Sequence, residues 1–330
     1  MSAKITDAVY QREPAWHGEG TVVEEDLRTW DEVREHLVID WDIEQRPVHV
    51  GGVRVPNFFA ATRTDNDKVL AINSNSYSLI GVEAFGRFVE RSMTEQTATW
   101  DAFNIIDEGM AMCATIKLDE PMMVPGDPSP VFPYIGFSNR IDAKGSLVAD
   151  PTAIRQVCWN TNSLFLIAAG DSGWVTSFRH TGGLDMSTAS DEVAQTIKLC
   201  RQAFLGFGGL ARELAEATIS VPKFVDRWLP IRQHMSDSTV TRVNHKRDAF
   251  NGALTGPRGV ERHDSAWGVL QAAVDAYQYS FPVHNGDVGR EKRTYSMIKA
   301  RIGGGLSPEE SNRSDDLRRA YSIVLDMAAV

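Results

Sequence analysis

The hydrophobic and polar positions along the chain follow one period before about residue 186 and another after it. Up to residue 180, short runs of β-branched and aromatic residues alternate with turn residues, which is typical of strands. From Ser187 onward, apolar residues recur at roughly helical spacing. The pattern therefore predicts an α+β fold, with a largely antiparallel sheet over residues 36–180 and packed helices after it. We expect an N-terminal arm and α+β sheet domain over 1–186, and a helical C-terminal region over 187–330, packed on or beside it.

Local signals delimit the expected elements. Thr29 and Glu32 form the capping-box pattern at the start of a short helix. A long helix that starts at Ser187 is expected to run for up to about 30 residues, weakened at Gly206. The N-terminal arm, residues 1–20, shows little periodicity. Strands are expected at 38–50, 53–62, 69–74, 100–106, 110–118, 131–138, 146–149, 154–162 and 175–180, and the other helices at 82–94, 223–229, 264–279, 295–301 and 307–329.

Polar side chains concentrate between Ile154 and Gly183, in what the pattern predicts to be a β-hairpin. Two β-prone runs flank a turn that contains Gly170 and Gly173. The register across this turn is not fixed by the pattern, so it stays open whether the arginines of the two runs share a face. The polar residues of the hairpin are Arg155, Gln156, Cys158, Asn160 and Asn162 in the first run, and Ser177, Arg179 and His180 in the second.

Four motifs in the chain also carry a resemblance. They are the run Arg155–Asn162 followed by Arg179–Gly182, the segment Pro14–Gly20 with its Trp-His-Gly, the step from Ser76–Ile80 to Ala84-Phe85, and the Trp-Gly segment Ala266–Tyr277. In this order they resemble the motifs of the phage/plasmid-like protein family, the domain of unknown function 932, over nearly the whole chain. The resemblance implies a gene of phages, plasmids and prophages, and a family without an established activity.

The composition of the chain predicts the cellular compartment in which the protein works. The chain has 330 residues, no run of 18 or more apolar residues and no apolar N-terminal segment, so no membrane span or signal peptide is expected. Its three cysteines, Cys113, Cys158 and Cys200, are far apart, which argues against a disulfide framework and favours the cytoplasm of a bacterial host. No two of the eight histidines lie within four residues of each other, so we expect no metal site and no cofactor.

Charge is distributed unevenly along the chain. The net charge is −10, and residues 1–50 hold 12 acidic and 5 basic residues. Residues 241–301 instead hold 10 basic and 6 acidic residues, with the densest basic run at Arg242, Lys246 and Arg247. A generally basic nucleic-acid binder is therefore excluded, whereas one local basic surface on an acidic body is not.

These observations favour a phage- or plasmid-encoded protein of DNA metabolism that binds nucleic acid. Single-stranded DNA is the favoured ligand, in recombination or replication, because arginine forks suit phosphate and aromatic residues near the hairpin offer stacking surfaces. Alternatively, Arg155 and Arg179 have a structural role and pair with carboxylates. The candidate nucleic-acid contacts are Arg155, Asn160, Asn162, Arg179, His180, Arg242, Lys246 and Arg247.

Two other functions stay open. One is an enzyme with a centre of Cys158, His180 and Asn160, in which a thiol and an imidazole form a nucleophile–base pair. Against it, a free cysteine is usually buried and behaves as a small hydrophobe. His17 is a further candidate if the N-terminal arm, anchored through Trp16, returns to the hairpin. The other function is an acidic host-interaction protein, and association into homo-oligomers is compatible with each reading.

Overall fold

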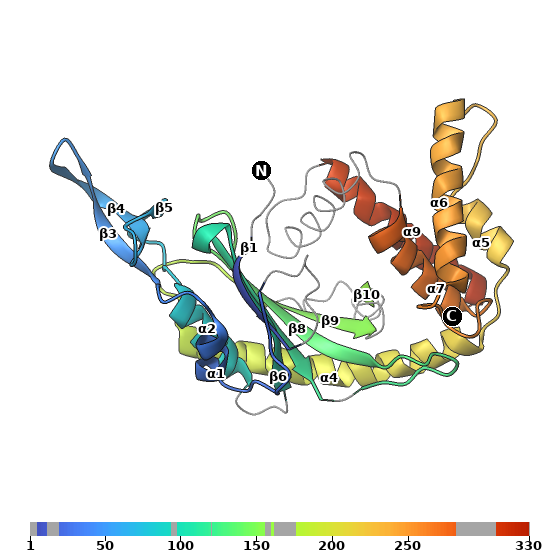
Figure 1. Ribbon diagram of the computed structural model, residues 1–330, viewed down its shortest axis with the longest axis horizontal. Helices are drawn as coiled ribbons and strands as arrows, with labels where there is room; N and C mark the ends of the chain where they lie inside the picture. Colours follow the sequence, from blue (N-terminus) through green and yellow to red (C-terminus); the bar gives the residue numbers. More distant parts are fainter. Residues whose placement is uncertain are drawn as a thin grey trace.

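The computed structural model describes residues 5–11, 20–93, 98–119, 121–155, 160–161, 176–281 and 308–329. A twisted main sheet forms the centre of the molecule, and a smaller three-stranded sheet projects at one end (Figure 1). Helices from the second half of the chain gather at the other end (Figure 1). The fold is α+β with mostly antiparallel strands followed by helices, which confirms the fold class predicted from the sequence.

The main sheet has eight strands in the order β10-β9-β8-β7-β6-β1-β2, with β11 also paired to β9. Neighbouring strands are antiparallel except β1 and β2, which are parallel. Strands β6 to β9 follow one another as a meander, which antiparallel strands allow because their connections can be short. The strands are β1 (Ile5–Tyr10), β2 (Thr21–Val22), β6 (Ala98–Ile106), β7 (Ala111–Leu118), β8 (Val131–Arg140), β9 (Leu147–Arg155), β10 (Asn160–Thr161) and β11 (Thr176–Phe178).

Strand β1 is the part of the main sheet that the sequence pattern misses. It pairs along its length with β6, with Val9 opposite Phe103. Four consecutive residues, Asp7 to Tyr10, are buried, so the strand has no exposed face and shows no alternation of apolar and polar residues. The N-terminal segment therefore contributes a central strand where we expected an arm without periodic structure.

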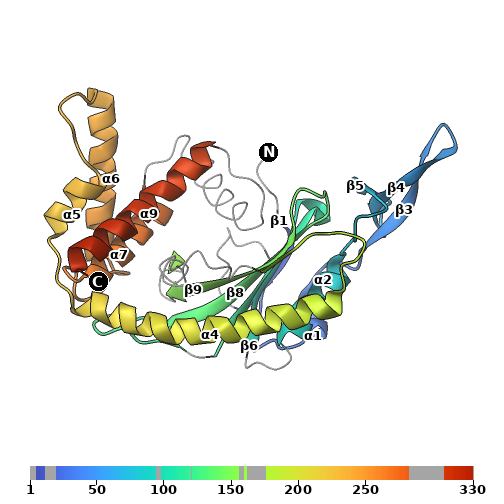
Figure 2. The same cartoon turned by 180° about the vertical axis from the view of Figure 1, so that it is seen from behind.

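Helices α2 (Val82–Met93) and α4 (Met186–Glu216) pack against one face of the main sheet, with α1 (Trp30–His36) beside α2 (Figure 2). The ring of Trp30 lies 4.9 Å from that of Phe103, between α1 and β6. Helix α4 has 31 residues and continues through Gly206 and two further glycines. Burial of its inner face outweighs the low helix propensity of glycine there.

The small sheet has the order β3-β4-β5, formed by β3 (Ile43–Val50), β4 (Val53–Arg63) and β5 (Val69–Ser74). Gly51 and Gly52 connect β3 to β4 with φ of 55° and 82°, the positive values that a two-residue hairpin turn requires. Two amides attach this sheet and the segment after it to the main sheet. Asn73 donates to the carbonyl of Ile141, and Asn139 donates to the carbonyl of Ile80, both at 2.9 Å.

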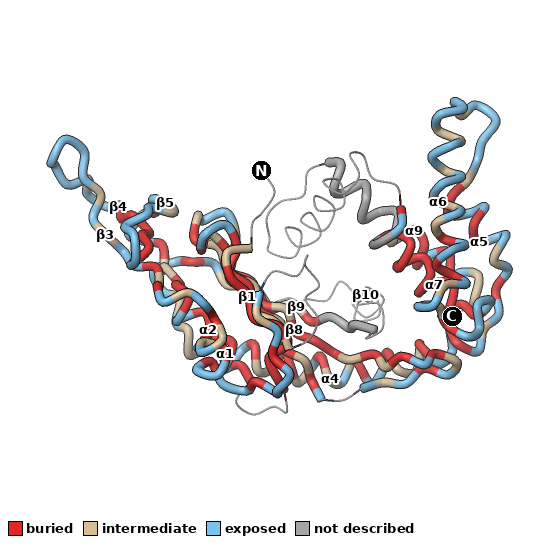
Figure 3. The backbone as a smooth tube through the Cα atoms, viewed as in Figure 1, coloured by how far each residue is buried: buried red, intermediate tan, exposed pale blue. Residues whose placement is uncertain are grey.

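The C-terminal helices surround an aromatic cluster. Helix α6 is absent from the sequence prediction, because its first three turns contain no buried residue and only two apolar positions, Val240 and Val243 (Figure 3). No helix in the described part of the chain is long and apolar enough to cross a membrane. The helices are α5 (Val221–Trp228), α6 (Asp237–Thr255), α7 (Ala266–Asp275), its π-helical continuation η2 (Ala276–Ser280) and α9 (Pro308–Ala328), and the cluster is Phe224, Trp228, Phe250 and Phe281.

Candidate functional site

Two short strands, β10 and β11, pair with the same edge of β9 at its opposite ends. Asn160 pairs with Arg155 at the end of β9, and Phe178 pairs with Leu147 at its start. Leu147 and Arg155 are eight residues apart, or about 26 Å along a strand. This pairing corrects the predicted hairpin: the second polar run pairs with the first half of β9, and the two runs do not face each other.

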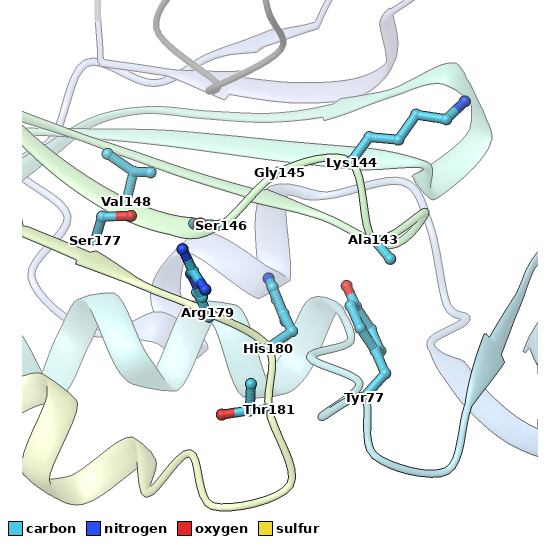
Figure 4. Close-up of a pocket in the computed structure, with 10 residues that line it drawn as sticks. All are labelled: Tyr77, Ala143, Lys144, Gly145, Ser146, Val148, Ser177, Arg179, His180 and Thr181. Atoms are coloured by element: carbon cyan, nitrogen blue, oxygen red, sulfur yellow. The ribbon is translucent and has the colours of Figure 1, made fainter. Parts of the chain in front are cut away.

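An open pocket lies where β11 ends, with a cavity volume of about 460 Å³. Three segments distant in sequence form it: the connection between β5 and α2, the loop from β8 into β9, and β11 with the residues that follow (Figure 4). A volume of this size is typical of small-molecule sites. The lining residues are Tyr77, Ala143, Lys144, Gly145, Ser146, Val148, Ser177, Arg179, His180 and Thr181.

His180 is buried at the pocket, with 7% of its surface exposed. Its Nδ1 lies 2.9 Å from the carbonyl oxygen of Ser78, which can only accept, so Nδ1 carries the proton. Nε2 is then an acceptor, and it has no hydrogen-bond partner among the described residues. Burial lowers the pKa of His180, and the hydrogen bond to Ser78 only partly opposes that effect. The imidazole is therefore neutral at neutral pH, and among the described residues its buried Nε2 has no donor to accept from.

Tyr77 fixes the orientation of this imidazole. The two rings are stacked, with centroids 4.7 Å apart and planes inclined by 12°. The hydroxyl of Tyr77 donates to the carbonyl of Arg140 at 2.6 Å. Burial, together with the negative charge of Asp142, raises the pKa of Tyr77, so the phenol stays protonated as a donor. The backbone of Tyr77 also bridges to Thr181, and the stack is thus held from both sides.

Arg179 supplies the positive charge of the pocket. It follows β11 and is exposed, and its guanidinium makes no hydrogen bond or ion pair with the described residues. In Figure 4 its side chain points in the same direction as that of His180, towards the loop at Ser146. The hydroxyl of Thr176 contacts Thr196 of α4 at 2.6 Å, so alternation along β11 directs Ser177 away from α4.

Lys144 adds a second cation at the rim. Its side chain is 77% exposed, and its Nζ lies 3.8 Å from a carboxylate oxygen of Asp142. That carboxylate is mainly engaged by Arg140, with hydrogen bonds of 3.0 and 2.6 Å. Although burial raises the pKa of Asp142, the hydrogen bonds and charge of Arg140 outweigh burial and lower it. Because Arg140 neutralises Asp142, Lys144 and Arg179 leave the pocket with a surplus of positive charge.

The basic run on α6 lies far from this pocket, at the opposite end of the molecule (Figure 1). Arg247 is held within the fold, since it donates to the carbonyl of Leu229 at 2.7 Å and to Asp226 at 2.9 Å. Arg242 is exposed and bonds weakly to its own helix. Lys246 lies 5.2 Å from the ring centroid of Phe281. The run therefore forms a separate surface, in which Arg242 is the exposed cation and Lys246 packs over the ring of Phe281.

The remaining candidates are only partly placed. His17, Cys158 and Asn162 lie outside the described residues. For Arg155 and Asn160 the structure describes only the backbone, which lies at the end of β9 that is distant from β11. The structure therefore brings Arg179 and His180 together, and it brings neither of them to Asn160.

Sequence reasoning missed most of the pocket. Tyr77 carried a signal only through its family motif, and Lys144 and Ser146 carried none, because their contribution depends on pairing between distant segments. In the described ranges, no three His, Cys, Asp or Glu side chains are placed to hold a metal ion. The donors present are a guanidinium, an ammonium, hydroxyls and a neutral imidazole. Such groups bind an anionic oxygen, as in a phosphate or a carboxylate.

Comparison with known families gives one match. The sequence profile described as a domain of unknown function (DUF932) matches residues 69–298, more than two thirds of the chain. The matched range contains every residue that lines the pocket. No curated protein and no solved structure matches the chain. The protein is therefore a member of the DUF932 family.

Proposed function

We propose that this protein binds nucleic acid, with a preference for single-stranded DNA, and that Arg179 holds a backbone phosphate at the pocket. The observation that carries the proposal is the state of Arg179. Eight arginines of the described residues form ion pairs with carboxylates, whereas Arg179 has no such partner and lines a pocket. On a chain of net charge −10, an unpaired guanidinium in a pocket favours an anionic ligand.

The size and lining of the pocket favour a flexible strand. About 460 Å³ accommodates roughly one nucleotide. A single strand can turn one phosphate towards Arg179, whereas a duplex presents its phosphates on a stiff surface.

Helix α6 supports the proposal with a second cationic surface. The helix projects from the C-terminal end of the molecule, and its first half is exposed (Figure 3). Arg242 is exposed there and bonds only weakly to its own helix. A strand long enough to reach from the pocket to α6 would gain phosphate contacts at both ends, and its affinity would increase with length.

The test is fluorescence anisotropy with labelled single-stranded and duplex oligonucleotides at several salt concentrations. We expect the parent protein to bind the single strand, and Arg179→Ala to weaken binding and reduce the salt slope by about one unit. The matched control is Arg212→Ala, because Arg212 is also exposed without a partner among the described residues but lies on the outer face of α4. No binding to either form at low salt, or equal losses for Arg179→Ala and Arg212→Ala, would overturn the proposal.

His180 favours a second candidate, an enzyme in which a substrate gains access to the buried Nε2, which has no hydrogen-bond partner among the described residues and accepts a proton. The Cys158 and Asn160 partners of the earlier enzyme hypothesis are not needed for this role. The test is hydrolysis of an activated phosphodiester by the parent and by His180→Gln. Equal rates for the two proteins would remove this candidate without affecting the binding proposal.

A further inference from the structure

The register of the ladder between β9 and β11 decides which side chains lie beside Arg179. The ladder ends with Phe178 opposite Leu147, and the next position of the same register sets Arg179 opposite Ser146. Because side chains alternate along a strand, Arg179 shares a face of the ladder with Ser146 and with Ser177, two residues before it. All three line the pocket, and the side chain of Arg179 points towards Ser146 (Figure 4).

This face of the ladder is turned away from α4. The hydroxyl of Thr176 contacts Thr196 of α4, so Ser177 and Arg179 lie on the other side, where both are exposed. Neither the hydroxyls of Ser146 and Ser177 nor the guanidinium of Arg179 form a hydrogen bond with the described residues. We call these three side chains the donor patch, since they offer one planar fork and two hydroxyls to a ligand.

The charge around the donor patch is positive. Among the described residues that line the pocket, none is acidic, and Arg179 and Lys144 are both cations. Asp142, in the same loop, is held by Arg140 in two hydrogen bonds. The side chain of Lys144 extends away from Arg179 in Figure 4, so Lys144 acts on the patch through its field and not by contact. The pocket therefore favours a ligand group with more than one negative charge.

The charge and the number of donors separate two kinds of phosphate. A phosphodiester inside a strand has two free oxygens and one negative charge. A phosphomonoester has three free oxygens and a charge of about −1.5 to −2 at neutral pH. The fork of Arg179 can bind two oxygens in parallel, and the serine hydroxyls can donate to the third. The donor patch therefore fits a monoester better than a diester.

We propose that the donor patch binds a phosphomonoester, the group at the end of a phosphorylated strand, so that Arg179 holds a nucleic acid by its terminus. This inference rests on the proposed binding of nucleic acid and specifies which phosphate enters the pocket. A free nucleoside monophosphate carries the same group, and a cavity of about 460 Å³ accommodates roughly one nucleotide. The two sources of the group compete for one site.

The experiment is fluorescence anisotropy with one single-stranded sequence, labelled on an internal base, in three forms. The forms carry a 5′-phosphate, a 3′-phosphate or hydroxyls at both ends. We expect one phosphorylated form to bind at least about 10-fold more tightly than the hydroxyl form, because hydrogen bonds to charged groups are the strong ones. A fluorescent nucleoside monophosphate should also bind, and the phosphorylated strand should displace it.

The double variant Ser146→Ala/Ser177→Ala tests the hydroxyls, since it keeps Arg179. It should lower the ratio of the two affinities by at least about 3-fold and leave the binding of the hydroxyl form near that of the parent. The matched control is Ser238→Ala, because Ser238 is exposed but lies on α6, far from the pocket (Figure 1). It should leave the ratio unchanged. Circular dichroism and thermal melting check that the variants fold.

The outcomes separate this inference from the proposed function. Equal affinities for the three forms of the strand, or a ratio that the double variant leaves unchanged, would overturn the inference and leave strand binding intact. Binding of the nucleoside monophosphate without binding of any strand would assign the donor patch to free nucleotides and overturn the proposed function. No binding of any probe would overturn both.

Discussion

Tyr77 is the residue whose replacement tests the construction of the pocket most directly. It is 7% exposed and makes two separable kinds of contact: a hydrogen bond from its hydroxyl to the Arg140 carbonyl, and ring contacts with His180 and Phe59. Tyr77→Phe removes only the hydrogen bond and leaves the carbonyl of Arg140 without that donor. Tyr77→Ala also removes the ring.

The structure sets the expected magnitudes. Loss of the hydroxyl should lower the free energy of unfolding by about 1–2 kcal/mol, the usual cost of leaving a partly buried group unsatisfied. Loss of the whole side chain should cost about 3–5 kcal/mol, because a cavity is added to the lost contacts. The difference between the two variants measures the ring contacts with His180 and Phe59.

Equilibrium unfolding in urea measures both losses of unfolding free energy. The dependence of that free energy on urea concentration must match the parent for the values to be compared. The oligonucleotide affinity of Tyr77→Phe should stay near that of the parent, because the hydroxyl bonds to a backbone carbonyl and not to Arg179. A loss below about 0.5 kcal/mol for Tyr77→Phe would show that this hydrogen bond does not stabilise the fold. If Tyr77→Phe and Tyr77→Ala lowered the free energy of unfolding equally, the stacked ring would not stabilise the fold.

Three further predictions concern the fold and its pH dependence. Since burial lowers the pKa of His180, the unfolded chain binds its proton first, and the free energy of unfolding should fall as pH drops below about 6.5; His180→Gln should flatten that part of a urea-derived stability profile. Gly86→Ala should cost about 3 kcal/mol or more in thermal melts, because the added Cβ would lie 2.2 Å from Trp30, whereas Gly206→Ala, which meets no atom within 4 Å, should be neutral or stabilising. Thr29→Ala should cost about 1 kcal/mol in the same assay by removing the capping box with Glu32, and a neutral result would mean that the cap frays in solution.

The elements that the sequence predicted well are those whose signal is local. The helix at Trp30–His36 begins at its predicted cap, and β4, β5 and α2 lie within one residue of their predicted ends. Strand β1 was missed because both of its faces are buried. Helix α6 was missed because its first half contains no buried residue. In each case the sequence lacks the regular alternation of apolar and polar positions on which such a prediction depends.

The candidate site was also predicted incompletely, because the sequence did not show which strands pair with each other. Arg179 and His180 were identified from the concentration of polar residues, but their partners were assigned to the wrong end of β9. The two expected strands at 146–149 and 154 are one continuous strand, Leu147–Arg155, and β11 pairs with its start. Strand register depends on contacts between distant segments, which a single sequence does not specify.

The three-segment construction of the pocket has a consequence for folding. Tyr77, the loop at Lys144 and the end of β11 at Arg179 are separated by tens of residues, and large loops must close before they meet. Contacts of such high sequence separation form slowly, whereas the hairpins of the β6–β9 meander close locally. The pocket should therefore appear late in refolding, after the meander. A fragment that retains the meander but lacks the segment before α2 would keep strands and lose one whole wall of the pocket.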